Sequence, residues 1–366
     1  MTAAPTPTSK CRVDKQAVAP SDECAPVKPR LPIVYPPHRA RQGAHVLTTV
    51  CGLAMATLLS IGAPHAARAE YPERPIKLVV GLAAGSGADI LVRFFADRLP
   101  AVSGATVIVE NKPGALTNIA NDAVAKARPD GYTLLMGASS GLIGNAYIYK
   151  NLPYDPVRDF TPVTTFAQLG FVLTVSAQNP ASSVAELTAQ LKAKGGRVTY
   201  GWANTSGLAS STLYLSEAGI EAVSVPYKAN PVAVSDVAAG QIDFVFSDAP
   251  YAIGQEKTGK VKLLGVTPAT RLSSLPNVPT MTEAGLPGAS IAPWWAVFAP
   301  AKTPPEIVAK IEGWFNRISS ARENREPLIA QGVEPLPGSS ENTKALMALS
   351  MKSWEKITRL TKIEPQ

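Results

Sequence analysis

Three segments of the sequence combine glycine with small hydroxyl or amide side chains directly after a predicted strand. They are Gly81-Leu-Ala-Ala-Gly-Ser-Gly-Ala-Asp89, Gly137-Ala-Ser-Ser-Gly141 and Ala203-Asn-Thr-Ser-Gly-Leu-Ala-Ser-Ser211. Glycine lets a ligand approach the backbone closely, and the free N–H groups at a helix N-terminus attract an anion. Because ligands of α/β proteins bind at the carboxyl ends of strands, the three loops together predict a site for a small anionic solute.

The first of these loops is not a nucleotide-binding loop. It matches neither G-x-G-x-x-G nor G-x-x-x-x-G-K-[ST]. The acidic side chain of Asp89 has two interpretations that the sequence leaves open. It orders a water or meets a second polar group of the ligand, or it caps the N-terminus of the helix that follows.

Ordinary catalysis is hard to build from this sequence. All three cysteines and all three histidines lie within residues 1–69, so the remaining chain has neither residue type. A cysteine nucleophile, a Ser-His-Asp triad and the soft or imidazole ligands of transition metals are therefore excluded from that part. A carboxylate-only or Ser-Lys enzyme stays formally open. We predict a binding protein that is not an enzyme, with no cofactor and no metal.

Residues 38–69 have the pattern of a cleavable signal peptide. Arg39 and Arg41 precede an apolar run over 46–63, which ends before the small-x-small pair of Ala67 and Ala69. A transmembrane anchor is the alternative, but the run is shorter than the roughly 20 residues that a spanning helix needs. We expect cleavage after Ala69 and a periplasmic product. Residues 1–40, rich in Pro, Ala and charge, are expected to be a disordered extension.

The basic character of the sequence belongs largely to this leader. Of the 35 basic and 28 acidic residues, eight and three lie in residues 1–69, which leaves 27 and 25. Nucleic-acid binding needs a basic stripe and is not predicted for a product so close to neutral.

Short apolar, β-branched runs alternate with helical patterns along most of the chain. This alternation predicts an α/β fold with mostly parallel sheets, and the length favours two lobes. Trp314 and Trp354 are expected to pack inside helical segments. The predicted strands are 76–81, 106–110, 132–136, 171–175, 198–200, 223–225, 242–246 and 261–266, and the main predicted helices are 89–99, 304–319, 323–331 and 341–360.

A series of short motifs lies in order along residues 71–366. The motifs are Tyr71-Pro-Glu-Arg-Pro-Ile-Lys-Leu-Val-Val80, Val109-Glu-Asn-Lys-Pro-Gly114, Arg128-Pro-Asp-Gly-Tyr-Thr-Leu-Leu135, Leu152-Pro-Tyr-Asp-Pro156, Val225-Pro-Tyr-Lys228, Gly240-Gln-Ile-Asp243, Leu275-Pro-Asn-Val-Pro-Thr280, Glu283-Ala-Gly-Leu-Pro287 and Trp294 through Ala299-Pro-Ala-Lys-Thr-Pro304. In these motifs the sequence resembles the Bug family, the substrate-binding proteins of tripartite tricarboxylate transporters. Within the predicted loops it departs from the family's usual pattern, at 84–87, at Ser210 and at Ala229.

The resemblance implies a two-lobed periplasmic-binding-protein fold, type II-like, with the ligand cleft at the hinge. The first lobe would comprise 70–169 and 290–366, and the second 170–289. The implied function is capture of a small organic acid, a carboxylate, by a monomer that delivers it to the permease subunits of such a transporter. An alternative is a ligand-sensing receptor that docks on a sensor kinase.

The predicted ligand-binding residues come from the loops just described and from Asp248, taken as the end of the last strand of the second lobe. They are Ser86, Gly87, Ala88, Asp89, Ser139, Ser140, Asn204, Ser206, Gly207, Ser210 and Asp248.

Overall fold

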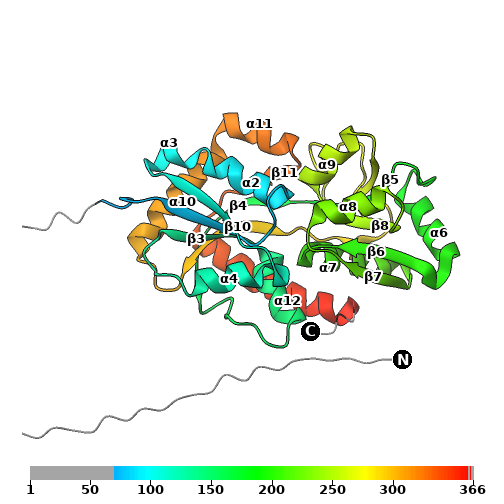
Figure 1. The fold of residues 1–366 in the computed structure, drawn as a ribbon, viewed down its shortest axis with the longest axis horizontal. Coiled ribbons are helices and arrows are strands. Elements are labelled where there is room, and N and C mark those ends of the chain that lie inside the picture. The colour runs from blue at the N-terminus through cyan, green and yellow to red at the C-terminus, as the bar shows by residue number, and fades with distance from the viewer. Residues whose placement is uncertain (1–69, 362, 364–366) are drawn as a thin grey trace, which may run out of the picture. The chain divides into compact units, whose positions relative to one another are not determined.

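The strands of the computed structural model form two separate sheets, each covered by helices (Figure 1). The structure describes residues 70–361 and 363, so the predicted extension and signal peptide lie outside the described residues. The strand order is β11-β4-β10-β3-β1-β2 in the first sheet and β7-β6-β8-β5-β9 in the second. The strands are β1 (Ile76–Val80), β2 (Val107–Asn111), β3 (Thr133–Ala138), β4 (Phe160–Leu169), β5 (Phe171–Ser176), β6 (Val198–Trp202), β7 (Ala222–Pro226), β8 (Phe244–Asp248), β9 (Val261–Val266), β10 (Trp294–Pro300) and β11 (Val333–Pro335).

The predicted α/β class is confirmed, but both sheets are mixed and not mostly parallel. In the first sheet β1 pairs in parallel with β2 and β3, whereas β10 runs antiparallel to β3 and β4, and β11 antiparallel to β4. In the second sheet β6 is parallel to β7 and β8, and β5 is antiparallel to β8 and β9. The strands that run against the others are therefore β10 and β11 in the first sheet and β5 in the second.

Every predicted strand is present, and no strand end is shifted by more than two residues. Three strands were not predicted, namely β4, β10 and β11. In addition, β9 follows β8 in the second sheet, so the placing of Asp248 at the end of its last strand is wrong.

Successive side chains of a strand point to opposite faces of its sheet. Both faces of each sheet carry apolar side chains, and helices cover both. In β1, Leu78 and Val80 pack with α2, α10 and α11, while Val79 faces α4 and α12. The second sheet is covered by α6 and α7 on one face and by α8 and α9 on the other. The α-helices are α2 (Gly87–Ala96), α3 (Leu99–Ser103), α4 (Asn118–Ala125), α5 (Asn145–Ile148), α6 (Val184–Lys194), α7 (Thr205–Ala218), α8 (Asn230–Ala238), α9 (Ala249–Lys257), α10 (Pro305–Ser320), α11 (Arg322–Ala330) and α12 (Ser340–Thr361).

The C-terminal helices have the predicted positions and packing. Trp314 of α10 and Trp354 of α12 are both buried in hydrophobic clusters, which confirms their expected packing role. The same cluster that holds Trp354 includes Leu213 of α7, so α12 packs on helices that belong to different sheets. None of the helices in the described part of the chain has the length and apolarity that crossing a membrane requires.

The chain passes between the two sheets at two adjacent points. Gly170 alone separates β4 from β5, and residues 267–293 lead back from β9 to β10. The two passages are hydrogen-bonded to each other, since Leu169 N donates to Pro293 O (3.1 Å) and Thr267 N donates to Phe171 O (2.9 Å). They therefore form a paired two-stranded connection between the sheets.

Candidate functional site

The loop between β1 and α2 turns the start of α2 toward the second sheet. Gly85 has a φ of 78°, a left-handed conformation that favours glycine. Ser86 is the N-cap of α2, and its Oγ accepts a hydrogen bond from Asp89 N (3.3 Å). The alternative that Asp89 itself caps the helix is therefore wrong. The other backbone N–H groups at the start of the first turn, those of Gly87 and Ala88, have no partner within the helix, as at any helix start.

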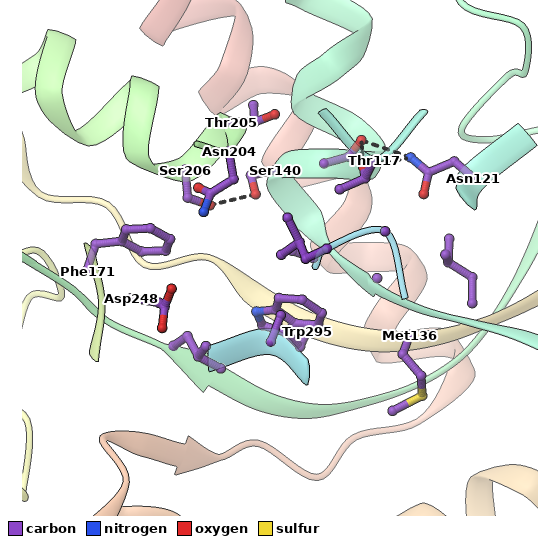
Figure 2. Close-up of a pocket in the computed structure, with 18 residues that line it drawn as sticks. Thr117, Asn121, Met136, Ser140, Phe171, Asn204, Thr205, Ser206, Asp248 and Trp295 are labelled. Atoms are coloured by element: carbon purple, nitrogen blue, oxygen red, sulfur yellow. Dashed lines mark hydrogen bonds between the residues drawn. The ribbon is translucent and has the colours of Figure 1, made fainter. Parts of the chain in front are cut away.

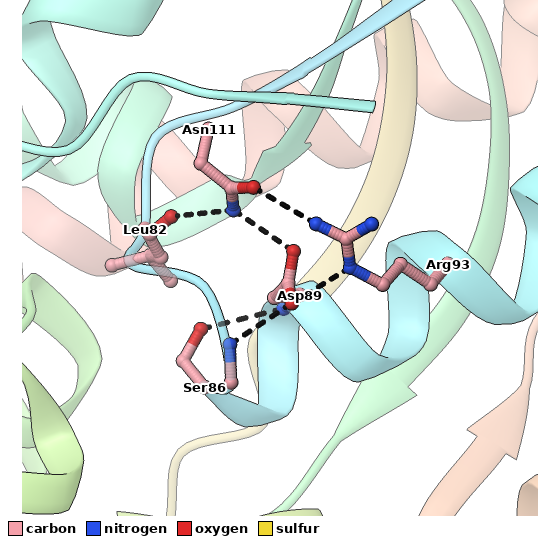
Figure 3. Close-up of polar contacts among 6 residues, drawn as sticks. Leu82, Ser86, Asp89, Arg93 and Asn111 are labelled. Atoms are coloured by element: carbon pink, nitrogen blue, oxygen red, sulfur yellow. Dashed lines mark hydrogen bonds and ion pairs between the residues drawn. The ribbon is translucent and has the colours of Figure 1, made fainter. Parts of the chain in front are cut away.

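Asp89 instead fixes this loop from inside through a set of contacts that we call the Asp89 network (Figure 3). Its Oδ2 accepts hydrogen bonds from Gly85 N and Arg93 Nε, both at 2.9 Å, and its Oδ1 accepts one from Asn111 Nδ2, also at 2.9 Å. The Asn111 amide donates as well to Leu82 O (3.0 Å), and its Oδ1 accepts from Arg93. The Asp89 network thus comprises Leu82, Gly85, Asp89, Arg93 and Asn111.

These contacts explain the protonation state of Asp89. Burial raises the pKa of this carboxyl, but hydrogen bonds from Arg93, Gly85 and Asn111 outweigh that effect and hold the pKa below its usual range. The charge stabilises the fold above the pKa of the unfolded state, and this contribution is lost as the pH falls through the lowered native pKa. Asp89 is thereby a charged positioning residue of the loop.

A second helix start, that of α7, meets the loop that follows β3. Asn204 is the N-cap of α7, and its Oδ1 accepts a hydrogen bond from Gly207 N (2.8 Å). The Ser206 hydroxyl donates to Ser140 Oγ (2.6 Å), and the Thr205 hydroxyl donates to Asn145 Oδ1 (2.6 Å). Side chains that follow strands of different sheets are thus in direct contact, as Figure 2 shows for Ser140 and Ser206.

Two predicted hydroxyl residues lie deeper in the protein. Ser139 is buried, and its Oγ accepts a hydrogen bond from Trp294 N (3.3 Å). Ser210 lies one turn beyond Ser206 on α7 and is fully buried, and its Oγ makes no hydrogen bond to any described residue. Neither side chain lines the cavities described below.

Asp248 ends β8 and is the N-cap of α9. Its Oδ1 accepts a hydrogen bond from Tyr251 N (3.2 Å), and its Oδ2 accepts one from Asn230 Nδ2 (2.7 Å). A Cβ atom added to Gly87 would overlap Asp248 Oδ1 and lie 2.7 Å from Asp248 Cγ. An acidic side chain from the second sheet therefore lies against the start of α2.

Burial raises the pKa of Asp248 to about 6, although the hydrogen bonds from Tyr251 and Asn230 act in the opposite direction. Because the native pKa exceeds the unfolded value, the native state binds more protons between about pH 4 and 6, and stability falls as the pH rises through that window. We expect Asp248→Asn, which keeps a good N-cap, to be more stable than the unmodified protein by about 2 kcal/mol at pH 7.5 and by much less at pH 4. Chemical denaturation at several pH values measures this, and a pH-independent difference would contradict it.

Two neighbouring cavities lie between the loops. The inner cavity has a volume of ≈ 30 Å³, enough for one or two waters, and the outer cavity has a volume of ≈ 610 Å³, within the range of small-molecule sites. Figure 2 shows part of the inner lining, with Asn204, Ser206 and Ser140 on one side and Asp248 and Trp295 on the other. Both cavities are lined by Gly81, Leu82, Thr117, Asn204 and Asp248, so they are parts of one cleft.

The structure brings about half of the predicted site residues together. Ala88, Ser140, Asn204, Ser206 and Asp248 line the inner cavity, and Ser86 lines the outer one. Gly87 touches Asp248 without lining either cavity. The other predicted residues do not line a cavity but contact the lining loops from the protein interior. They are Asp89 and Ser139 through their side chains, Gly207 through its backbone, and the buried Ser210.

Several lining residues were not predicted. Thr117 lies in the connection from β2 to α4, has a φ of 80°, and donates its hydroxyl to Gly141 O (3.3 Å), whereas Asn121 lies inside α4. Lys228 follows β7 in the connection to α8 and lines the outer cavity. Treating every strand-to-helix connection as a candidate loop would have found Thr117 and Lys228. Phe171 and Trp295 lie on strands beside the passages between the sheets, and no sequence signal singles them out.

Among the described residues, no group of three or more His, Cys, Asp or Glu side chains has the geometry of a metal site. Within the inner cavity, Asp248 is the one ionisable side chain of the described lining. The cleft therefore offers hydroxyl, amide and backbone N–H donors around a single carboxylate.

The sequence matches the model of the tripartite tricarboxylate transporter family receptor over residues 91–363, so the chain belongs to this family. The R. palustris protein Rpa4515, solved with adipate, is 31% identical with a TM-score of 0.79, over 81% of this chain and 100% of that one. The periplasmic binding protein BugD is 28% identical with a TM-score of 0.76, over 81% and 100%. MatC from Rhodopseudomonas palustris, with bound malate, is 27% identical with a TM-score of 0.74, over 78% and 99%.

These similarities confirm the resemblance to the Bug family and the periplasmic-binding-protein fold. The family consists of solute receptors, which confirms the prediction that the chain is not an enzyme.

Proposed function

We propose that this protein is a periplasmic receptor that captures a small organic carboxylate and delivers it to the permease subunits of a tripartite tricarboxylate transporter. The observation that carries the proposal is the convergence of the starts of α2 and α7, with Ser140 and Ser206, on one cleft at the ends of strands. Neutral donors of this kind bind a carboxylate through directed hydrogen bonds and the helix dipole. Two related structures, Rpa4515 with adipate and MatC with bound malate, support the same class of ligand.

The proposal assigns the ligand oxygens to donors on both sides of the cleft. The backbone N–H of Ala88 would act from the start of α2, together with the hydroxyl of Ser86, and Gly87 would let this helix start approach Asp248 closely. Hydroxyl and amide groups would act from the other loops, and Ser139, Gly207 and Ser210 would hold these loops in place from the protein interior. The residues given this direct role are Ser86, Ala88, Ser140, Asn204 and Ser206.

The proposal also includes motion of two lobes, 70–169 with 290–366 and 170–289, about the paired passages at Gly170 and near Pro293. The inner cavity is too small for an organic acid such as adipate, so entry of a ligand needs the loops to separate. Export of the chain by a signal peptide over about 38–69 completes the proposal. N-terminal sequencing by mass spectrometry checks it, with Glu70 or Tyr71 expected as the first residue.

A thermal-shift panel of organic acids tests the receptor function. The full-length gene is expressed in a bacterium that exports it, and the purified protein is heated with mono-, di- and tricarboxylates, amino acids and aromatic acids. A ligand at one hundred times its Kd stabilises the native state by about 2.7 kcal/mol, which is readily seen. Absence of any shift with the whole panel, with neutral sugars as the control set, would contradict the proposal.

A further inference from the structure

The carboxylate of Asp248 has acceptor capacity left for a group inside the cleft. An ionised carboxylate accepts about four hydrogen bonds, and Tyr251 N and Asn230 Nδ2 supply two of them. The side chain is buried, yet it lines both the inner and the outer cavity. Its remaining acceptor positions are therefore available to a group that enters the cleft.

The other side of the inner cavity presents donors. The Ser206 hydroxyl donates to Ser140 Oγ, which leaves the Ser140 proton able to donate elsewhere. Asn204 uses its Oδ1 to accept from Gly207 N, so its amide N–H groups are not taken up by that contact. The inner cavity therefore has hydrogen-bond donors on one side and an acidic acceptor on the other (Figure 2).

This polarity disfavours a ligand that is negatively charged at both ends. A carboxylate placed beside Asp248 would be repelled, and the described lining of the inner cavity holds no Lys, Arg or His to offset two like charges. Lys228 lines the outer cavity and is exposed, and it forms no ion pair with any residue that the structure describes. It does not line the inner cavity, so a group at the Asp248 end would remain without a cation.

We propose that Asp248 is a specificity-determining residue that selects a ligand carrying an ammonium group close to its carboxylate. The ammonium group hydrogen-bonds Asp248, and the carboxylate binds the donors of Ser140 and Asn204. The inference rests on the proposed carboxylate-receptor function and adds the requirement for a positively charged donor. With a pKa of about 6, the Asp248 side chain is charged at pH 7.5, as this pairing needs.

Matched ligand pairs test the proposal. Succinate with L-aspartate, and glutarate with L-glutamate, share chain length and carboxylates and differ by the ammonium group. Isothermal titration at pH 7.5 is expected to show at least tenfold tighter binding of the amino member of the better pair. Asp248→Asn is expected to weaken binding of that amino member at least tenfold, while binding of its plain partner is unchanged or becomes tighter.

Two further variants separate recognition from folding. Asp248→Ser removes the charge and keeps a good N-cap for α9, so it should repeat the loss if Asp248→Asn folds poorly. Asp243→Asn removes another carboxylate of the second sheet, one that pairs with Lys194 outside both cavities, and should keep the preference.

Equal affinity of the unmodified protein for both members of each pair would overturn the inference and leave the receptor proposal standing. An equal loss of both members in Asp248→Asn would also overturn it, because it would show a structural role. Absence of binding by every acid, in the unmodified protein and the variants alike, would overturn the proposed function and the inference with it.

Discussion

Replacing Asp89 with alanine is expected to lower the free energy of unfolding by about 3 kcal/mol, because the change removes the buried carboxylate that accepts hydrogen bonds from three donors. The Asp89 side chain is only 5% exposed and binds Gly85 N, Arg93 Nε and Asn111 Nδ2. Arg93 is half exposed, so its guanidinium group can hydrogen-bond water in the variant, and this limits the loss of stability. Chemical denaturation measures the change.

A matched control is available in α4. Asp122 pairs with Lys126 at the same i,i+4 spacing, but the lysine is 67% exposed. Asp122→Ala should therefore change the free energy of unfolding by no more than about 0.5 kcal/mol. If both variants lower the free energy of unfolding by the same amount, the Asp89 network contributes no more to stability than a surface ion pair does. The positioning role assigned to Asp89 would then be wrong.

Replacing Gly87 with alanine is expected to weaken ligand binding about a hundredfold while the protein remains folded. The added methyl group would overlap the Asp248 carboxylate, so the start of α2 and the start of α9 could not approach as closely. Overpacking of this kind costs typically 1–3 kcal/mol, and here it falls on the contact across the cleft. The Kd of the best acid from the thermal-shift panel, measured by calorimetry, gives the size of the effect.

Gly254 provides the comparison for this variant. It lies inside α9, and a Cβ atom added there meets no atom within 4 Å. Gly254→Ala should leave the Kd unchanged and stabilise the helix by about 0.5–1 kcal/mol. Unchanged affinity in Gly87→Ala as well would show that the approach of Asp248 to α2 is not needed for binding.

The strands that the sequence predicts best are those whose apolar runs stand between clear loop signals. Strand β4 was missed because Pro162, Thr164 and Thr165 interrupt its apolar pattern. Its Thr164 is nonetheless buried, with its hydroxyl donating to Gly338 O (3.0 Å). Strand β10 is apolar throughout and buried on both faces, a pattern that fits a central strand. The prolines at its two ends, and the predicted helices that follow it, made this pattern hard to recognise as a strand.

The site was predictable as a set of loops but not as a set of contacts. Ser86, Ser140 and Ser206 follow strands, and strand ends are visible in a sequence. The pairing of Asp248 with the start of α2 joins residues from different sheets, and it depends on how closely two helix starts approach. The role of Asp89 depended in the same way on Asn111, a residue from a neighbouring strand that local sequence does not connect to it.

The insertion of β10 between β3 and β4 has a consequence for the order in which this chain folds. Strands β1 to β4 leave the ribosome first, but their sheet lacks its central antiparallel strand until β10 has been made. The second sheet is built from one continuous stretch, β5 to β9, and can complete its pairing earlier. Contacts between distant parts of a chain form slowly, because a long loop must close first. We therefore expect the second sheet to gain hydrogen-exchange protection first during refolding, with the edges of β3 and β4 protected only when β10 arrives.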